Sequence, residues 1–160
     1  MTDEQVYASA AAMGALAGMR CMSAPAMVSQ VAKAGRMAMS HSELDFFHNP
    51  KTAYAFTALA VGEAIVDKLP FMPKRTQTPS LFGRVVAGGL SGVAISSSKR
   101  KSILIGAIAG ALGAVAAAYA FCHLREAAQK KLHVSDTTAA LVEDALVTGG
   151  GMFILSRLYP

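Results

Sequence analysis

The feature that most constrains the fold is the gathering of apolar residues into five blocks, each close in length to a membrane-spanning helix. A helix needs about 20 mainly apolar residues to cross about 30 Å of hydrocarbon. The second and third blocks are short, so tilt or local thinning of the bilayer would be needed there. The blocks cover residues 9–32, 53–69, 81–96, 103–124 and 138–155. This pattern predicts an all-α, polytopic membrane bundle of about five transmembrane helices, forming a single domain over residues 1–160.

The composition supports the same prediction. The chain is 53% hydrophobic and 16% charged, with a mean hydropathy of +0.40, whereas soluble domains carry about a quarter charged residues. Alanine and glycine dominate the blocks, and small residues allow close packing of helices in lipid. The acidic start of the chain is unlike a signal peptide, so we expect the first block to remain in the mature protein.

The distribution of lysine and arginine does not choose a membrane orientation. With five crossings, six of these residues fall on the side of the N-terminus and seven on the other side. Such a tie is expected of a chain that inserts in both orientations as an antiparallel dimer, but an error in the number of crossings would give the same tie.

Two pairs of segments are similar to each other. Residues 14–18 resemble residues 106–110, and residues 57–64 resemble residues 138–145, in the same order. With the third block between them, the two units would form an inverted repeat, as in many transporters. Helices rich in alanine and glycine also resemble one another by composition alone.

Three blocks carry two glycines four residues apart, which places both on one helix face: Gly14 and Gly18, Gly88 and Gly92, Gly106 and Gly110. These faces predict close helix packing, either within one chain or between the subunits of a homo-oligomer, most simply a dimer. Three consecutive glycines at residues 149–151 predict a break or hinge in the last block.

Charged residues inside the apolar blocks are the most informative feature, because each costs about 2.5 to 3.5 kcal/mol at the centre of a spanning helix. The set is Arg20, Glu63, Asp67, Arg84, Glu143 and Asp144. We predict an ion-paired cluster that binds a small ion or metabolite, in which Arg20 pairs with Glu63 or Glu143. Alternatively, the four residues near block ends, Asp67, Arg84, Glu143 and Asp144, reach the membrane interface by extending their side chains.

Proline marks two further sites. Pro25 removes a backbone hydrogen bond, so we predict that the first helix is kinked or split there. The connection over residues 70–79 holds three prolines and should be extended. Its basic residues Lys74 and Arg75, with Lys68 before them, either lock two helices together through Asp67 or form a basic mouth for anions.

No residue pattern indicates a cofactor, a metal site or catalysis. The four histidines are scattered without metal-ligand spacing, and no nucleophile elbow or phosphate-binding loop occurs. The basic residues flank the blocks, which indicates a lipid bilayer and not a nucleic acid as partner. An enzyme is therefore the least favoured class.

Several stretches are similar to a known family. They are residues 18–20, 24–26, 62–63, 66–70, 73–76, 84, 88–92, 110–115 and 141–144. In these stretches the chain resembles a family of small bacterial membrane proteins catalogued as domain of unknown function four-one-two-six. Residues 67–70 and 73–76 are its most specific part, whereas the polar loop over 39–49 and the methionine-rich first block depart from it. The resemblance implies a multi-pass protein of the bacterial inner membrane, and it implies no activity.

Two functions follow from these patterns. The first is a small transporter or channel whose ion-paired cluster binds its substrate. The second is a structural subunit whose charges pair permanently and whose glycine faces dock into a larger membrane assembly. A cavity that reaches Arg20 and Glu63 would favour transport, and its absence with all charges paired would favour assembly.

Overall fold

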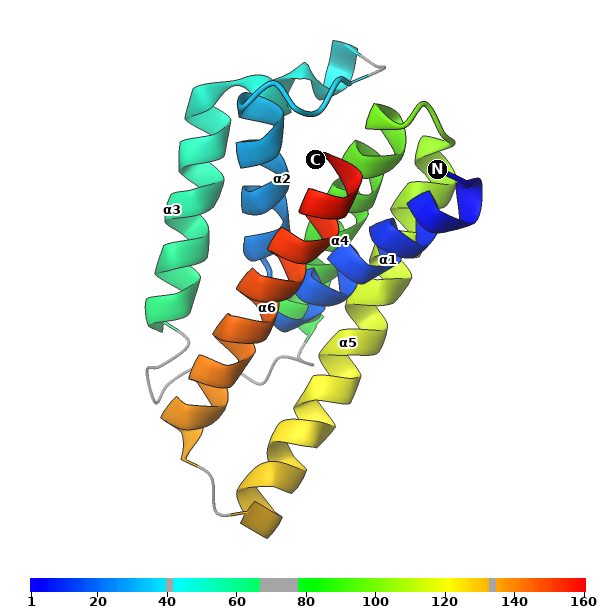
Figure 1. Cartoon of the computed structure of the whole chain (residues 1–160). Coiled ribbons are helices and arrows are strands. Elements are labelled where there is room, and N and C mark those ends of the chain that lie inside the picture. The colour runs from blue at the N-terminus through cyan, green and yellow to red at the C-terminus, as the bar shows by residue number, and fades with distance from the viewer. Residues whose placement is uncertain (40–41, 67–77, 133–134) are drawn as a thin grey trace.

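In the computed structural model, which describes residues 1–39, 42–66, 78–132 and 135–160, every regular element is helical (Figure 1). The elements are α1 (Asp3–Met19), α2 (Ser23–Lys33), the 3₁₀ turn η1 (Ser42–His48), α3 (Pro50–Val66), α4 (Thr78–Ser98), α5 (Ile103–Leu132) and α6 (Asp136–Leu158). The predicted all-α class is confirmed.

Three helices in the described part of the chain are long and apolar enough to cross a membrane: Pro79–Ser98, Ile103–Ala127 and Thr137–Leu158. Many of their large apolar side chains are exposed, which is the reverse of a soluble fold and is typical of a lipid-facing surface. Phe82 is 69% exposed, Leu104 68%, Leu112 64% and Met152 65%. The fold is that of a helical membrane protein.

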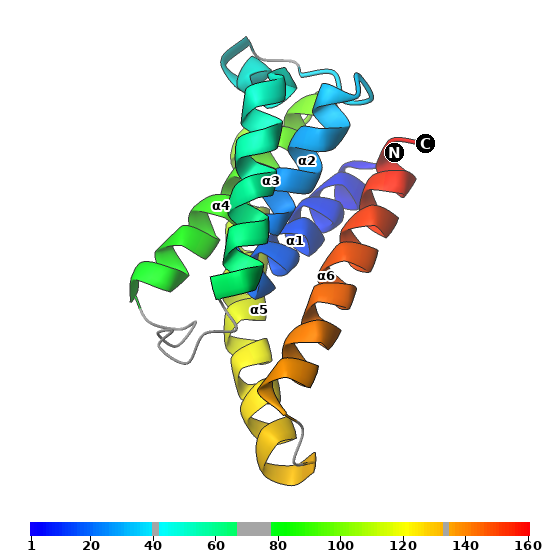
Figure 2. The same cartoon turned by 90° about the vertical axis from the view of Figure 1, so that its left-hand side faces the viewer.

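Helices α1 and α2 form a hairpin. The start of α1 lies near the α4–α5 loop, because the backbone N–H of Ser102 donates to the Tyr7 hydroxyl at 3.2 Å. The residues after α2 lie near the C-terminus, because Arg36 and Tyr159 line one groove. Two views agree that α1 runs away from this end of the molecule and α2 returns to it (Figures 1 and 2).

This hairpin corrects the predicted topology. We expected residues 9–32 to form one crossing, with the termini on opposite sides, but the chain reverses within that block and both termini lie at the same end (Figure 2). The reversal lies between Met19 and Ser23, before the predicted site at Pro25. Proline instead occupies the first turn of α2, where its missing N–H is not needed.

The end of α2 is fixed by its backbone. Gly35 has a φ of 72°, and its N–H donates to Ala32 O at 2.9 Å while the Arg36 N–H donates to Val31 O at 3.2 Å. These two bonds form a Schellman motif, which requires the left-handed conformation that glycine adopts without strain. The motif places Arg36 directly beyond the hairpin.

Helix α1 packs against α4 and α5, and its second half is buried. A Cβ atom on Gly14 would overlap the backbone of Gly110, and one on Gly92 would overlap Gly106 O. A Cβ on Gly18 would overlap Ala114 O, and one on Gly88 would overlap Gly110 O and the Ala114 side chain. The glycine faces therefore pack helices within one chain, which is the first of the two alternatives above.

Two other predictions concern α5 and α6. The triple glycine at residues 149–151 does not break α6, which is helical from Asp136 to Leu158. Each glycine makes the helix less stable than alanine would by about 1 kcal/mol. In apolar surroundings, breaking the backbone hydrogen bonds of the helix would cost more than this. Helix α5 is also uninterrupted, whereas its supposed counterpart is a hairpin, so the two units of the predicted repeat differ in structure.

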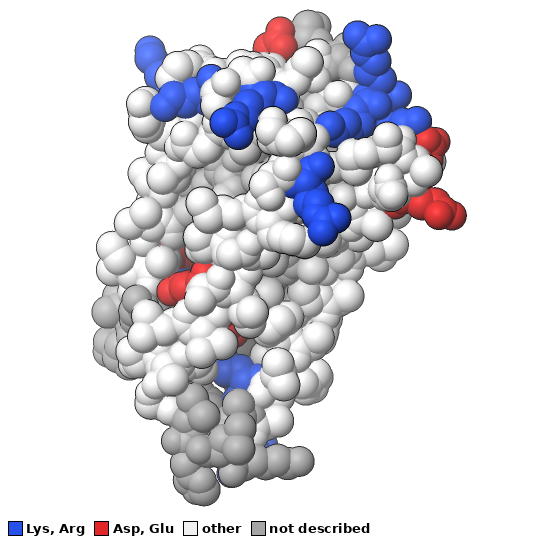
Figure 3. Space-filling view, viewed as in Figure 1, with Lys and Arg blue, Asp and Glu red and all other residues white. Residues whose placement is uncertain are grey.

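One end of the molecule, hereafter the basic end, collects lysine and arginine (Figure 3). It holds the ends of α2, α4 and α6 and the starts of α3 and α5, with Lys33, Arg36, Lys51, Lys99, Arg100, Lys101 and Arg157.

Contacts at the basic end tie the two termini to the α4–α5 loop. Lys99 Nζ donates to Leu158 O at 2.6 Å, and Lys101 pairs with Asp3. The hydrogen bond and charge of Asp3 raise the pKa of Lys101. Burial raises the pKa of Tyr159 to about 12, although the hydrogen bond with Ser98 opposes this shift.

Candidate functional site

The candidate site is built around the interruption between α1 and α2, at Arg20, Cys21 and Met22. A helix end leaves backbone groups without intrahelical partners, and such groups are costly away from water. The Arg20 N–H still bonds to Leu16 O at 2.8 Å, and the Ser23 N–H reaches Arg20 O at 3.4 Å. Four further backbone groups at this turn are bonded by side chains from α3 and α4.

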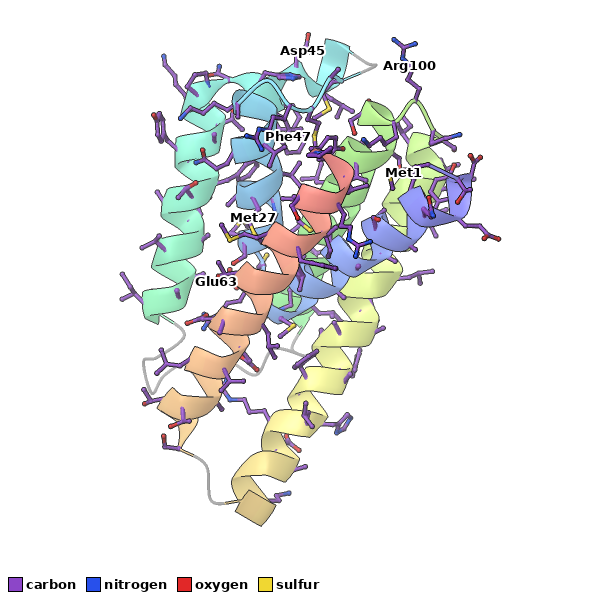
Figure 4. The ribbon with its side chains drawn as sticks, viewed as in Figure 1. Met1, Met27, Asp45, Phe47, Glu63 and Arg100 are labelled. Carbon is purple, nitrogen blue, oxygen red and sulfur yellow. The ribbon has the colours of Figure 1, made fainter. Side chains whose placement is uncertain are left out.

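Glu63 of α3 caps the start of α2. Its Oε1 accepts the Cys21 N–H and its Oε2 accepts the Met22 N–H, both at 2.8 Å. The start of a helix carries a partial positive charge, which stabilises a carboxylate there. Figure 4 shows Glu63 on the side of α3 that faces the rest of the bundle. The contact joins α3 to the hairpin turn.

Arg84 of α4 caps the end of α1. Its Nη1 donates to Gly18 O at 2.7 Å and to Met19 O at 2.8 Å, and its Nε donates to Ser80 Oγ at 3.3 Å. The end of a helix carries a partial negative charge, which stabilises a cation. Arg84 Nη2 also lies 3.7 Å from Glu63 Oε1, so the two capping side chains form an ion pair.

Arg20 forms a second ion pair. Its Nη2 lies 2.6 Å from Asp144 Oδ1 of α6, and its side chain is 2% exposed. We predicted Glu63 or Glu143 as the partner, and the ion pair shown is with Asp144. Neighbouring residues on a helix point in different directions, so Asp144 faces Arg20 while Glu143 faces α5.

Glu143 takes part in a third ion pair. Its Oε2 lies 3.6 Å from Arg125 Nη1 of α5. Glu143 and Arg84 are each 5% exposed, so neither side chain extends to an interface as the alternative reading proposed. The pair joins α5 to α6.

A cavity of about 210 Å³ lies beside the Arg20–Asp144 pair. Helices α2, α3 and α6 form its walls, and Ser23, Thr57 and Thr148 add hydroxyl groups. Glu63 is not among its lining residues. The cavity therefore offers a small ligand one cation, one carboxylate and several hydroxyls.

Some predicted site residues cannot be compared with the structure. Asp67, Lys68, Lys74 and Arg75, and with them the predicted lock or mouth, lie outside the described residues. In the described ranges, no group of three or more His, Cys, Asp or Glu side chains could hold a metal ion.

Sequence reasoning missed the roles of Glu63 and Arg84 as helix caps. A signal was available at residues 20–25. Proline is favoured in the first turn of a helix, so Pro25 marks a new helix start a few residues before it as well as a kink. A carboxylate and a guanidinium elsewhere in the bundle would then be expected at the two new helix ends.

A family model described as "Domain of unknown function (DUF4126)" matches residues 7–157. No curated protein and no solved structure matches the chain.

Proposed function

Because the chain belongs to the family described as Domain of unknown function (DUF4126), whose description gives no activity, we propose its function from geometry alone: membrane transport of a small ion or metabolite. In this proposal α3, α4, α5 and α6 cross the bacterial inner membrane and the α1–α2 hairpin enters it from the basic end. The substrate binds beside Arg20 and Asp144.

The observation that carries the proposal is the cavity lined by Arg20 and Asp144 at the tip of the hairpin. Non-helical backbone at membrane depth is tolerated where protein buries it or where it lines a water-filled cavity. Transporters place substrate sites at such interrupted helices. Ionisable residues inside a bundle also mark substrate pathways. The ion pair would open to exchange its internal contact for contacts to the substrate.

The cavity reaches Arg20 but not Glu63, so the condition set for transport is met in part, and the alternative of a structural subunit that docks through its glycine faces keeps some support. This alternative is consistent with two ion pairs that could be permanent, Arg84 with Glu63 and Arg125 with Glu143. However, the glycines on which docking depended are in contact within the chain. A homo-oligomer remains part of our proposal, with a contact surface other than these glycines.

We expect one or more small ions or metabolites in a thermal-shift screen to stabilise the purified protein. A ligand present at 100 times its dissociation constant raises the free energy of unfolding by about 2.7 kcal/mol. Asp144→Asn should abolish the shift, because it removes the charge that balances Arg20 at the cavity. The control is Asp45→Asn, since the Asp45 side chain is 67% exposed and lies at the basic end (Figure 4).

The same ligand should then cross the membrane of vesicles that contain the wild-type protein. It should cross more slowly into empty vesicles and into vesicles that contain Asp144→Asn. A ligand that binds without crossing would indicate a binding protein and contradict transport. A shift that Asp144→Asn leaves unchanged would place the ligand elsewhere.

A further inference from the structure

A second, larger groove runs beside α2 towards the basic end and adjoins the cavity of the proposed transport site, since Thr57 and Thr148 line both. Its volume is about 510 Å³, within the range of about 300 to 1,000 Å³ that small-molecule sites occupy. Helix α2 lies between α3 and α6, which flank the groove (Figure 2). If the bundle axis follows the membrane normal, the groove opens sideways to the hydrocarbon.

The lining of the groove suits an acyl chain. Met27 and Val31 of α2 and Met152 and Leu155 of α6 supply apolar surface. Methionine is unbranched and adapts to flexible ligands. Met27 packs against Gly151, where a Cβ would overlap its side chain, so the absence of a side chain at that glycine leaves room for Met27. Figure 4 shows Met27 between α2 and α6.

The charge of the groove is confined to one end. Arg36, which the Schellman motif holds just beyond α2, is the cation among its lining residues. Arg36 is exposed and belongs to the basic end. Basic pockets between membrane helices bind anionic headgroups, and a Lys or Arg near an anionic membrane surface contributes about 1 kcal/mol.

We propose that this groove is a binding site for one anionic phospholipid of the surrounding bilayer, with its phosphate at Arg36 and an acyl chain along Met27 and Met152. The exposed apolar face at Leu104, Ile108 and Leu112 in the first half of α5 serves as the comparison surface, because none of these side chains lines the groove. The proposal does not need transport, because the lipid contacts that it names, Arg36, Met27 and Met152, line the groove and not the adjoining Arg20–Asp144 cavity.

The chain has no tryptophan, so one introduced tryptophan reports on a single place. In the test, Met152→Trp carries the reporter in the groove and Leu112→Trp carries it on the exposed face of α5. Each variant is reconstituted in neutral phosphatidylcholine with a small fraction of either brominated phosphatidylglycerol or brominated phosphatidylcholine. Bromine quenches tryptophan fluorescence on contact.

At Met152→Trp we expect brominated phosphatidylglycerol to be preferred about fivefold over brominated phosphatidylcholine, the factor equivalent to about 1 kcal/mol from one cation. At Leu112→Trp the two lipids should quench equally. Adding Arg36→Gln should abolish the preference, whereas adding Lys51→Gln, a change at an exposed cation of the basic end that does not line the groove, should leave it.

Equal quenching by both lipids at Met152→Trp would overturn the proposal, as would a preference that survives Arg36→Gln. Protection from both lipids would overturn it too, because protein, such as a second copy, would then cover the groove. Preferential quenching by brominated oleate over brominated phosphatidylglycerol would assign the site to a free fatty acid and overturn the phospholipid assignment.

Discussion

Replacing Arg84 with methionine should lower the free energy of unfolding by about 3 to 5 kcal/mol, the cost of removing one partner of a buried ion pair. Methionine fills much of the same space, but it cannot donate to Gly18 O and Met19 O or balance Glu63. The measurement is thermal or denaturant unfolding of the purified protein in detergent, followed by circular dichroism.

The control for this variant is Arg100→Met, because Arg100 is exposed in the α4–α5 loop (Figure 4). Its effect should stay within about 0.5 kcal/mol, as for most surface substitutions. If Arg84→Met is no more destabilising than Arg100→Met, Arg84 does not hold the end of α1. The double variant Arg84→Met with Glu63→Gln should lose less than the sum of the single changes, because the two side chains act together.

Replacing Gly110 with leucine should destabilise the protein by about 3 kcal/mol or more, at the upper end of overpacking effects. A Cβ at Gly110 would meet the backbone of Gly88 and Gly92, and backbone cannot move aside as a flexible side chain can. We expect a large fall in melting temperature or a loss of folded protein, measured by size-exclusion chromatography after heating.

The matched control is the same substitution at Gly149, where an added Cβ meets nothing within 4 Å. Leucine there should stabilise α6 by up to about 1 kcal/mol, because glycine is a poor helix former. A Gly110→Leu variant as stable as Gly149→Leu would show that α4 and α5 are not in close contact. Since the Gly88–Gly92 face packs inside the chain, leucine at both positions should disrupt the fold and not merely separate subunits.

Much of the helical organisation could be predicted from the sequence, because apolar length and composition carry it directly. The predicted blocks at 81–96, 103–124 and 138–155 lie within α4, α5 and α6. The buried charges also stood out, because Arg20 and Glu63 interrupt apolar segments where each charge is costly. That cost implies partners, and ion pairs are present.

The hairpin and the identity of the partners could not be predicted, because both depend on contacts between distant residues. Residues 9–32 have the length of a crossing helix, and no local pattern shows that Glu63 and Arg84 are placed to satisfy the groups freed by a reversal. Likewise, choosing Asp144 over Glu143 for Arg20 requires the rotation of α6 about its axis. The sequence periodicity of α6 does not reveal this rotation, because the helix is apolar around most of its surface.

The central claim is that α1 and α2 form a hairpin that returns to the basic end, and a distance between spin labels tests it most directly. Labels are attached to cysteines placed at Glu4 and Ala34, which are both exposed, with Cys21 and Cys122 replaced by serine. A continuous helix would separate these positions by about 45 Å, at 1.5 Å per residue. The hairpin predicts a distribution centred well below that value, in either membrane orientation. A distribution centred near that value would contradict it.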